Sequence, residues 1–159
     1  MSVMYCQYKE KIYLADLDEN LVEITSDVKE NGFIPYTDIL GNVHTDIFVK
    51  NLDVHDVELL FEQNIFIKYC GKYFETFAGK ITKDVLQEEK IMIFTSSECI
   101  AKEMNFNKKE QFVFIKDIKL EDIEEIKIVN RPISIFADRE RKETRIEKKD
   151  IRKWLFDAI

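Results

Sequence analysis

The order of apolar and polar positions along the chain occurs twice. The segment DIFVKNLDVHDVELL at residues 46–60 returns 66 positions later as FVFIKDIKLEDIEEI at residues 112–126, with apolar or polar character kept at most positions. Three shorter pairs of segments occur in the same order in both halves: residues 5–13 with 66–74, 21–26 with 91–96, and 31–33 with 104–106. A repeated sequence builds the same supersecondary unit at each copy. We therefore predict a tandem duplication.

Each repeat opens with a pattern that is typical of a β-hairpin. Alternating apolar and polar residues are interrupted by a short polar turn. In the second repeat Gly71 occupies the turn, where positive φ is needed, whereas the first repeat has Glu10 there. The next segments, residues 21–25 and 90–95, are rich in β-forming residues and predict a strand.

A short helix is predicted after that strand in the second repeat. It covers residues 98–104, with Ser96 or Ser97 as its N-cap and Asn105 at its end. The first repeat has only a reduced version of this helix, between residues 27 and 32.

The long shared segment predicts a strand, a helical turn and a second strand. Residues 112–118 are apolar on both sides of the alternation, which indicates burial on both faces. Residues 120–126 have apolar positions at i, i+3 and i+6, as one helical turn would, and lead into a strand over residues 126–129. Each repeat is then an antiparallel meander of about four or five strands that curls into a small barrel or half-barrel.

The chain beyond the second repeat is strongly charged. Residues 132–136 alternate as an additional strand would, and residues 137–149 are either a loop or the far arm of a hairpin through residues 144–146. Residues 150–158 have apolar positions at i, i+3, i+4 and i+7, which predicts an amphipathic helix that docks on the sheet.

The predicted fold class is α+β and mostly β, with two duplicated antiparallel modules, a short helix in each, and a C-terminal helix. The predicted domains are an acidic first module, a second module, and a charged hairpin or loop with the C-terminal helix, at residues 1–63, 64–133 and 134–159.

Composition places the chain among soluble globular proteins. It has 159 residues, 45% hydrophobic and 35% charged, with four Gly and two Pro. No apolar stretch is long enough to span a membrane, and the N-terminus lacks the pattern of a secretory signal, so we expect a cytoplasmic protein without a membrane partner. Three cysteines without paired spacing, Cys6, Cys70 and Cys99, indicate buried free thiols rather than disulfides or a zinc site.

Charge differs between the two repeats. Residues 1–65 hold 4 Lys and Arg against 13 Asp and Glu, whereas residues 66–159 hold 20 against 18. An acidic surface attracts a basic partner and repels nucleic acid, although it also serves solubility alone. The candidate partner-binding residues are Asp16, Asp18, Glu19, Asp27, Glu30, Asp38, Asp46, Asp53 and Asp56.

Sequence motifs of catalysis are absent. The chain has no phosphate-binding glycine loop, no GxSxG elbow and no HExxH pair. The segment DVHD at residues 53–56 has three potential metal ligands, but one short segment seldom makes ligands converge, so we interpret it as a solvated turn. The carboxylate at Asp56 is in position to cap that turn. We therefore predict a protein that is not an enzyme and needs neither metal nor cofactor.

Residues 69–74 and 91–96, together with the segments 114–116 and 120–126, resemble small Firmicutes immunity proteins of polymorphic toxin systems of the contact-dependent or Rhs/Wap type. The resemblance covers residues 5–133. It implies a cytoplasmic protein without enzymatic activity that neutralises a toxin domain, often a nuclease, by binding it.

The leading hypothesis is an immunity protein whose acidic face binds a basic toxin domain. The alternative is a nucleic-acid-associated regulatory module that uses the basic segment at residues 137–159, although acidic residues alternate with the basic ones there. A third option is a structural subunit whose exposed strand edges pair with another chain.

Overall fold

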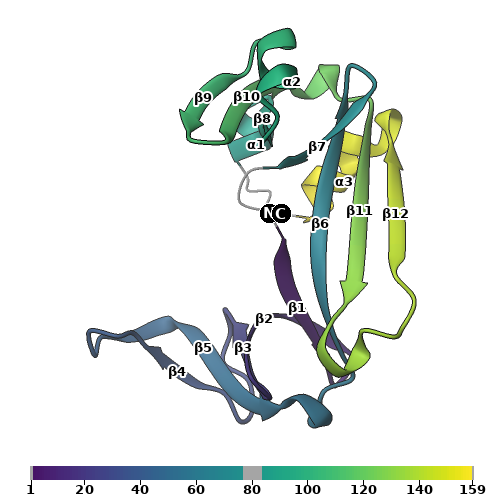
Figure 1. Cartoon of the computed structure of the whole chain (residues 1–159). Helices are drawn as coiled ribbons and strands as arrows, with labels where there is room; N and C mark the ends of the chain where they lie inside the picture. Colours follow the sequence, from purple (N-terminus) through teal and green to yellow (C-terminus); the bar gives the residue numbers. More distant parts are fainter. Residues whose placement is uncertain (1, 77–83, 159) are drawn as a thin grey trace. The chain divides into compact units, whose positions relative to one another are not determined.

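The structure is a computed structural model that describes residues 2–76 and 84–158, and the chain divides into two compact units (Figure 1). The N-terminal unit consists of residues 4–62 and 131–141. The C-terminal unit consists of residues 63–76, 84–130 and 142–158, together with residues 2 and 3. Three strands, β1 (Val3–Tyr8), β6 (Leu59–Tyr69) and β11 (Glu125–Pro132), contribute residues to both units.

Antiparallel strands build the N-terminal unit. Along its sheet the order is β4-β5-β3-β2-β1, followed by β6. Besides most of β1 and the first part of β6, the elements of this unit are β2 (Lys11–Asp18), β3 (Leu21–Ser26), β4 (Ile34–Thr37), β5 (Val43–Asp53), and the 3-10 turns η1 (Val54–Asp56) and η3 (Ser134–Phe136).

The C-terminal unit repeats this order with its own strands. Its sheet runs β9-β10-β8-β7-β6, and β11 pairs with both β6 and β12. Its further elements are β7 (Lys72–Thr76), α1 (Asp84–Glu88), β8 (Lys90–Thr95), α2 (Glu98–Glu103), β9 (Asn107–Glu110), β10 (Val113–Lys119), η2 (Leu120–Asp122), β12 (Lys142–Glu147), η4 (Lys148–Asp150) and α3 (Ile151–Ala158). The prediction of a mostly β, antiparallel protein with a C-terminal helix is confirmed.

The first hairpin of each unit turns through two successive residues with positive φ. These φ values are 48° and 68° at Lys9 and Glu10, and 49° and 78° at Cys70 and Gly71. Two positive φ values are what a tight two-residue hairpin turn requires. Gly71 adopts this conformation without steric cost, as predicted, whereas Glu10 carries its side chain into the left-handed region.

A glutamate that follows a 3-10 turn closes each hairpin. The Glu10 amide donates to Glu58 Oε1 at 2.9 Å, and the Gly71 amide donates to Glu124 Oε1 at 3.1 Å. The backbone of the same glutamates binds the first strand of the hairpin. The Glu58 amide donates to Gln7 O and the Glu124 amide to Lys68 O, each at 2.9 Å.

Each unit has its own hydrophobic core on one side of its sheet. In the N-terminal unit the Tyr13 and Phe33 rings lie 5.5 Å apart, and in the C-terminal unit the Phe74 and Phe106 rings lie 5.2 Å apart. Cys6 is fully buried, so its prediction as a core residue is confirmed. The largest fully buried residues of the two cores are Val22, Ile24, Val54 and Leu60 in one, and Ile67, Ile93, Ile123, Ile126 and Leu155 in the other.

Several predicted elements are confirmed. Helix α2 begins after Ser97, whose Oγ accepts from the Ile100 amide at 3.3 Å, and Asn105 follows its end with a φ of 59°. The hairpin through residues 144–146 exists as β12, which pairs with β11. Among the described residues no helix has the length and apolar character to cross a membrane.

Other predictions are wrong. No helix forms between residues 27 and 32, because Ser26 Oγ accepts from the Val28 amide and holds a turn there. Residues 134–136 form a 3-10 turn instead of a strand, with a φ of 57° at Ser134. Cys70 and Cys99 are exposed, because they lie in a hairpin turn and on the outer side of α2.

Burial of the strand at residues 112–118 on both faces is also wrong. Phe112 is 69% exposed and precedes β10, with a φ of 61°, in the turn between β9 and β10. Only one side of β10 enters the core, as Ile118 does.

Candidate protein-docking face

Alternation along β2 and β3 gives the N-terminal sheet one core side and one solvent-facing side. Tyr13 and Ala15 enter the core, so Leu14 and Asp16 point away from it. On β3, Val22 is buried and its neighbours lie on the opposite side. We call this solvent-facing side the outer face; its residues are Ile12, Leu14, Asp16, Asp18, Leu21, Glu23, Thr25, Asn51 and Asp53.

Strand register brings acidic side chains of the outer face together. Asp16 is paired with Glu23, and Asp18 with Leu21, which in turn is paired with Asp53. Like charges directly opposite each other on antiparallel strands destabilise a sheet. Neither Asp16 nor Glu23 has an ion-pair partner among the described residues. The fold therefore keeps an uncompensated repulsion at this position.

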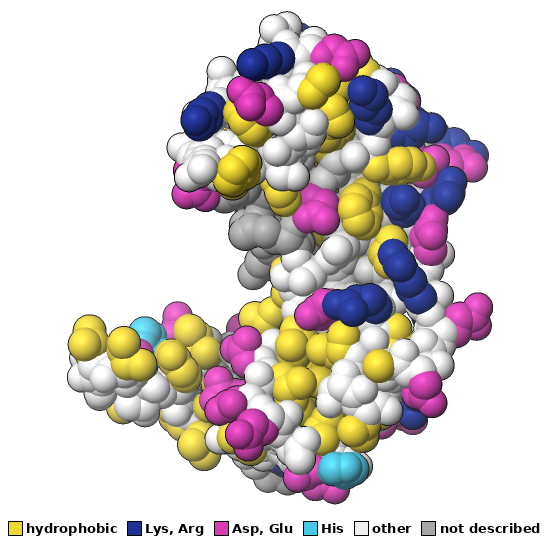
Figure 2. Space-filling model, viewed as in Figure 1, with side chains coloured by type: hydrophobic (Ala, Val, Ile, Leu, Met, Phe, Trp, Pro, Cys, Tyr) yellow, Lys and Arg dark blue, Asp and Glu magenta, His cyan; other side chains and the backbone are white. Residues whose placement is uncertain are grey.

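Exposed apolar side chains lie beside these carboxylates. Ile12, Leu14 and Leu21 are 55%, 47% and 51% exposed. Figure 2 shows a group of hydrophobic side chains on the N-terminal unit with acidic side chains along its margin. Exposed apolar groups rimmed by polar ones are typical of protein interaction sites.

Asp53 belongs both to the outer face and to the turn that follows β5. Its Oδ1 accepts from the His55 amide at 2.9 Å and lies 2.6 Å from His55 Nδ1. Both hydrogen bonds lower the pKa of the Asp53 carboxyl, and the one from the His55 backbone amide has the larger effect. Asp53 thus caps η1, and Asp56 is the last residue of that turn. Within the described residues no group of three His, Cys, Asp or Glu side chains is placed to hold a metal ion.

Two other predicted residues are engaged inside the N-terminal unit. Glu30 Oε1 accepts from Lys11 Nζ at 3.0 Å and from the Tyr13 hydroxyl at 2.9 Å, and the hydrogen bond from Lys11 lowers the pKa of Glu30. Asp38 organises the turn between β4 and β5. Both carboxylates therefore make interactions that stabilise the structure of the N-terminal unit.

The remaining predicted residues lie away from the outer face or at its border. Glu19 is in the turn between β2 and β3, with a φ of 54°, and Asp27 follows the end of β3. Asp46 lies on β5 beyond the residues that pair with β3, and Asp56 is in η1. Of the nine predicted residues the structure brings Asp16, Asp18 and Asp53 together.

Sequence reasoning missed six members of the outer face. These are one carboxylate, three apolar residues and two uncharged polar residues: Glu23, Ile12, Leu14, Leu21, Thr25 and Asn51. The alternation within the two strands of residues 11–26 contained a signal for them, since Tyr13 and Ala15, like Val22 and Ile24, are buried core residues two positions apart.

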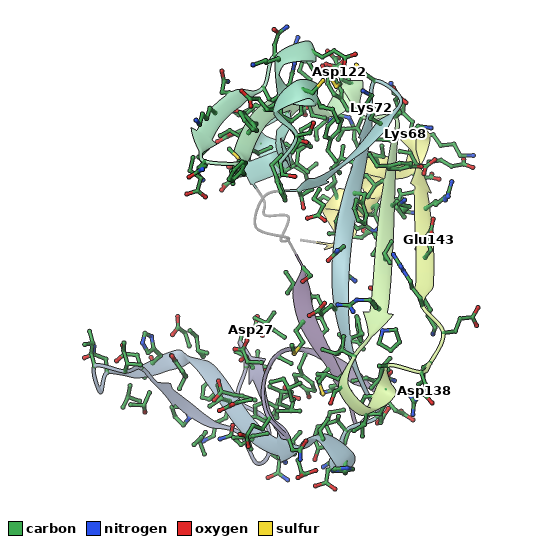
Figure 3. The ribbon with its side chains drawn as sticks, in the orientation of Figure 1. Asp27, Lys68, Lys72, Asp122, Asp138 and Glu143 are labelled. Carbon is green, nitrogen blue, oxygen red and sulfur yellow. The ribbon has the colours of Figure 1, made fainter. Side chains whose placement is uncertain are left out.

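The corresponding side of the C-terminal sheet has a different chemistry. Lys127 Nζ lies 4.1 Å from the centre of the Tyr73 ring and 5.1 Å from that of Phe66. The Tyr73 hydroxyl donates to Glu125 Oε1 at 2.6 Å, which raises the pKa of Tyr73. Lys68, labelled in Figure 3, also approaches the Tyr73 ring, at 5.7 Å. Cations and rings on this side are paired with one another.

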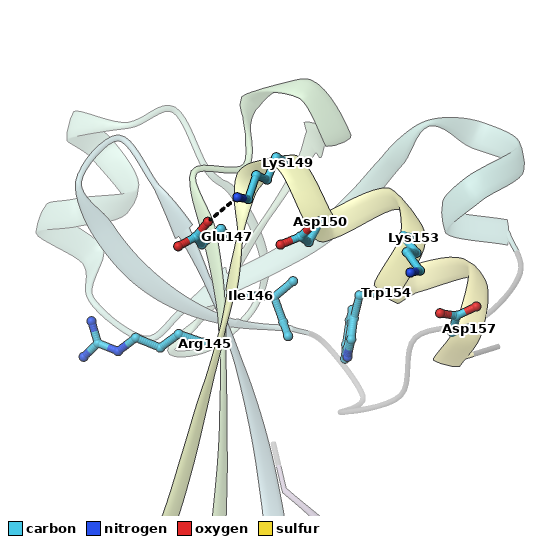
Figure 4. Close-up of a pocket in the computed structure, with 8 residues that line it drawn as sticks. All are labelled: Arg145, Ile146, Glu147, Lys149, Asp150, Lys153, Trp154 and Asp157. Atoms are coloured by element: carbon cyan, nitrogen blue, oxygen red, sulfur yellow. Dashed lines mark ion pairs between the residues drawn. The ribbon is translucent and has the colours of Figure 1, made fainter.

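The C-terminal unit also has an open groove between β12 and α3, shown in Figure 4. It has a volume of about 520 Å³ and is lined by Trp154 and Ile146 together with three basic and three acidic side chains. Two of the lining residues form an ion pair, in which Lys149 Nζ lies 3.4 Å from Glu147 Oε2. Balanced charge gives the groove no preference for an anion or a cation.

Comparisons with family models, with curated proteins and with solved structures find no match to this chain.

Proposed function

We propose that this chain is a protein-binding module whose outer face docks on a basic protein. More specifically, we propose an immunity protein that neutralises a toxin domain by binding it directly. The proposal depends on one observation. Asp16 and Glu23 lie opposite each other without an ion-pair partner among the described residues, beside the exposed side chains of Ile12 and Leu14.

The two kinds of side chain on the outer face have different roles in binding. Carboxylates steer a basic partner toward the face and increase the association rate, most strongly at low ionic strength. Apolar side chains at the centre of an interface exclude water and slow dissociation. A basic partner also relieves the repulsion between Asp16 and Glu23.

A toxin domain as the partner is supported by the resemblance of residues 5–133 to immunity proteins of Firmicutes. Nuclease domains are basic where they hold nucleic acid, because phosphate contacts supply much of their affinity. An acidic face with apolar residues at its centre suits such a surface and would prevent nucleic acid from reaching it.

The nucleic-acid alternative is less well supported by the basic segment at the C-terminus. Arg145 Nη2 lies 3.0 Å from Glu143 Oε1, and Arg152 Nη2 lies 2.5 Å from Glu89 Oε2. These cations are neutralised within the protein, whereas nucleic-acid binding requires cations that face phosphates.

The proposal includes a duplicated origin of the two modules. It is supported by the common strand order, by the paired positive φ values of the first hairpins, and by the hydrogen bonds of Glu58 and Glu124. In this interpretation one module kept the acidic and apolar outer face that binds the partner, and the other became nearly neutral in net charge.

The test uses the full chain and the toxic C-terminal domain of a secreted protein, which the proposal requires to be encoded by a neighbouring gene. The variant combines Asp16→Asn, Asp18→Asn and Glu23→Gln, and its control makes the same change in net charge with Glu110→Gln, Glu121→Gln and Asp122→Asn. We expect the first variant to associate about tenfold more slowly at low salt, with a smaller difference at high salt. The control is expected to associate as the natural chain does.

Two results would contradict the proposal. Equal association rates for the variant and its control would remove the outer face from the interaction. Cells that express the toxic domain and die despite the natural chain would show that this protein does not give immunity.

A further inference from the structure

The β4–β5 hairpin ends in two apolar side chains that the protein leaves in solvent. Ile39 is 99% exposed and Leu40 is 81% exposed, at the turn between the two strands. In Figure 2 hydrophobic side chains occupy the end of this hairpin, and Figure 1 shows it extending from β3. Two adjacent large residues with this exposure contribute nothing to the core of the unit.

Hydrogen bonds fix the turn that presents these side chains. Asp38 Oδ1 accepts from the amides of Leu40 and Asn42, each at 2.9 Å, and Asp38 Oδ2 lies 3.1 Å from His44 Nε2. The backbone adds the Gly41 amide to Asp38 O and the Asp38 amide to Asn42 O, each at 3.0 Å. A turn fixed in this way loses little conformational entropy when it binds.

The surroundings of Ile39 and Leu40 are acidic and apolar. No Lys or Arg occurs between residues 30 and 49, whereas Asp38 and Asp46 lie within the hairpin. Strand β4 is at the edge of the sheet and carries no charged side chain. Edge strands are commonly protected by lysine, and this one is not.

The hairpin at the same place in the C-terminal unit shows the usual protection. Strand β9 is at the opposite end of the strand order and reads Asn-Lys-Lys-Glu. The turn that follows it exposes a single large apolar residue, Phe112. The apolar tip of the β4–β5 hairpin is therefore a property of one module and not of the strand order that both share.

We infer that the β4–β5 hairpin is an anchor that inserts Ile39 and Leu40 into an apolar cleft of a basic protein. This inference rests on the proposed function and adds to it a second contact on the same partner. The partner's cleft has an apolar floor for these two side chains and a basic rim for Asp38 and Asp46. Rigid apolar residues that fill a pocket supply a large share of the energy of protein association.

Charge complementarity favours a basic protein over a membrane or a second copy of the chain. Segments that bind anionic lipid surfaces combine apolar residues with Lys or Arg, and residues 30–49, which include the turn and the part of β5 that pairs with β4, have neither cation. Two copies that meet at their tips would bring Asp38 and Asp46 of each copy together, and like charges repel.

The test places a photo-crosslinking benzoylphenylalanine at one of three positions of the full chain. The positions are Ile39 in the hairpin tip, Leu14 on the outer face, and Phe112 as the matched tip of the C-terminal unit. The probe is the same toxic C-terminal domain, which the proposed function requires to be encoded by a neighbouring gene. We expect cross-links from positions 39 and 14 and none from position 112.

The pattern of cross-links separates the two proposals. A cross-link from position 14 alone would overturn the anchor and leave the docking face standing. A cross-link from position 39 alone would support the anchor and contradict the outer face. The absence of a cross-link from both positions would contradict the anchor and the docking face. A cross-link from position 39 to a second copy of the chain would show self-association in place of the anchor.

Substitution gives an independent measure of the same anchor. The double variant Ile39→Ser and Leu40→Ser is expected to dissociate from the toxic domain at least about tenfold faster, whereas Phe112→Ser leaves dissociation unchanged. Unchanged dissociation of the double variant would overturn the inference. So would sedimentation of the natural chain, but not of the double variant, with vesicles of phosphatidylcholine and phosphatidylglycerol.

Discussion

The N-terminal and C-terminal units share a strand order and the conformation of the first hairpin turn, and they differ in the side chains that face solvent. The position of Gln7 in the first hairpin corresponds to that of Lys68, and the position of Ile12 to that of Tyr73, as the registers of the two hairpins show. Glu23 and Met92 occupy corresponding places on β3 and β8. Core positions tolerate few substitutions because they are closely packed, whereas solvent-facing positions vary with little effect on stability.

The two solvent-facing sides differ in whether their charged side chains have partners within the protein. On the C-terminal side Lys127, Tyr73 and Glu125 interact with one another. On the N-terminal side Asp16 and Glu23 face each other without a cation. A surface whose charged side chains already interact with one another gains little from a charged binding partner. The surface with unpaired carboxylates is therefore the better candidate for binding.

The largest predicted effect tests whether the two cores are equivalent. Ile24 and Ile93 are both fully buried and occupy the same place in the two strand orders. We expect Ile24→Ala and Ile93→Ala each to lower the free energy of unfolding by about 2–5 kcal/mol, through lost burial and the cavity that remains. Urea unfolding measures both, and a loss under about 1 kcal/mol at only one position would break the equivalence.

The second prediction concerns the first hairpin turns. Gly71→Ala places a side chain at a φ of 78°, and we expect it to destabilise the protein by about 1 kcal/mol. Glu10→Gly removes the corresponding strain at a φ of 68° and is expected to be less harmful than Glu10→Ala, since Gly has no Cβ. Thermal unfolding of the three variants measures this order, and a neutral Gly71→Ala would contradict it.

A smaller effect of opposite sign is predicted for Asp16. Asp16→Asn removes the repulsion with Glu23, so we expect it to raise the free energy of unfolding by a few tenths of a kcal/mol. The same substitution is expected to slow association with the basic partner. Asp122→Asn is the control in the C-terminal unit, and a loss of stability in Asp16→Asn would show that the carboxylate serves the fold.

The smallest effect is a local response of the β4–β5 turn to acid. Hydrogen bonds from the backbone of Asn42 and from His44 lower the pKa of Asp38 from 3.8 to about 2. Because the pKa is lowered by folding, the contribution of Asp38 to stability is complete above about pH 4 and is lost as the pH falls through about 2. NMR shifts of the Leu40 and Asn42 amides should follow this titration, and Asp38→Asn should abolish it. A midpoint near 4 would contradict the hydrogen-bonded turn.

Local sequence signals predicted the elements whose structure depends on nearby residues. The helix after Ser97 depends on a cap within the same turn of chain, and the hairpin at Gly71 depends on one backbone conformation. The predictions that are wrong concern features that depend on contacts between residues distant in sequence or on where a residue lies in the fold. Cys70 and Cys99 are exposed because of where they lie on a turn and a helix, which composition does not reveal.

Register explains most of what was missed at the candidate site. The sequence comparison aligned residues 21–26 with 91–96, whereas burial and strand register align Val22 with Ile91 and Ile24 with Ile93. A shift of one residue moves every side chain of a strand to the other face, so the outer face was not predictable from that alignment. The hydrogen bonds of Glu30 to Lys11 and Tyr13 were not predictable either, because these partners are distant from Glu30 in sequence.

Hydrogen exchange of the full chain, with and without the toxic domain that the proposed function requires, tests the central claim most directly. We predict slower exchange of backbone amides in residues 12–25 and 36–47 when the toxic domain is bound, and unchanged exchange in residues 107–122. Protection confined to the C-terminal unit would contradict binding through the acidic and apolar surface of the N-terminal unit.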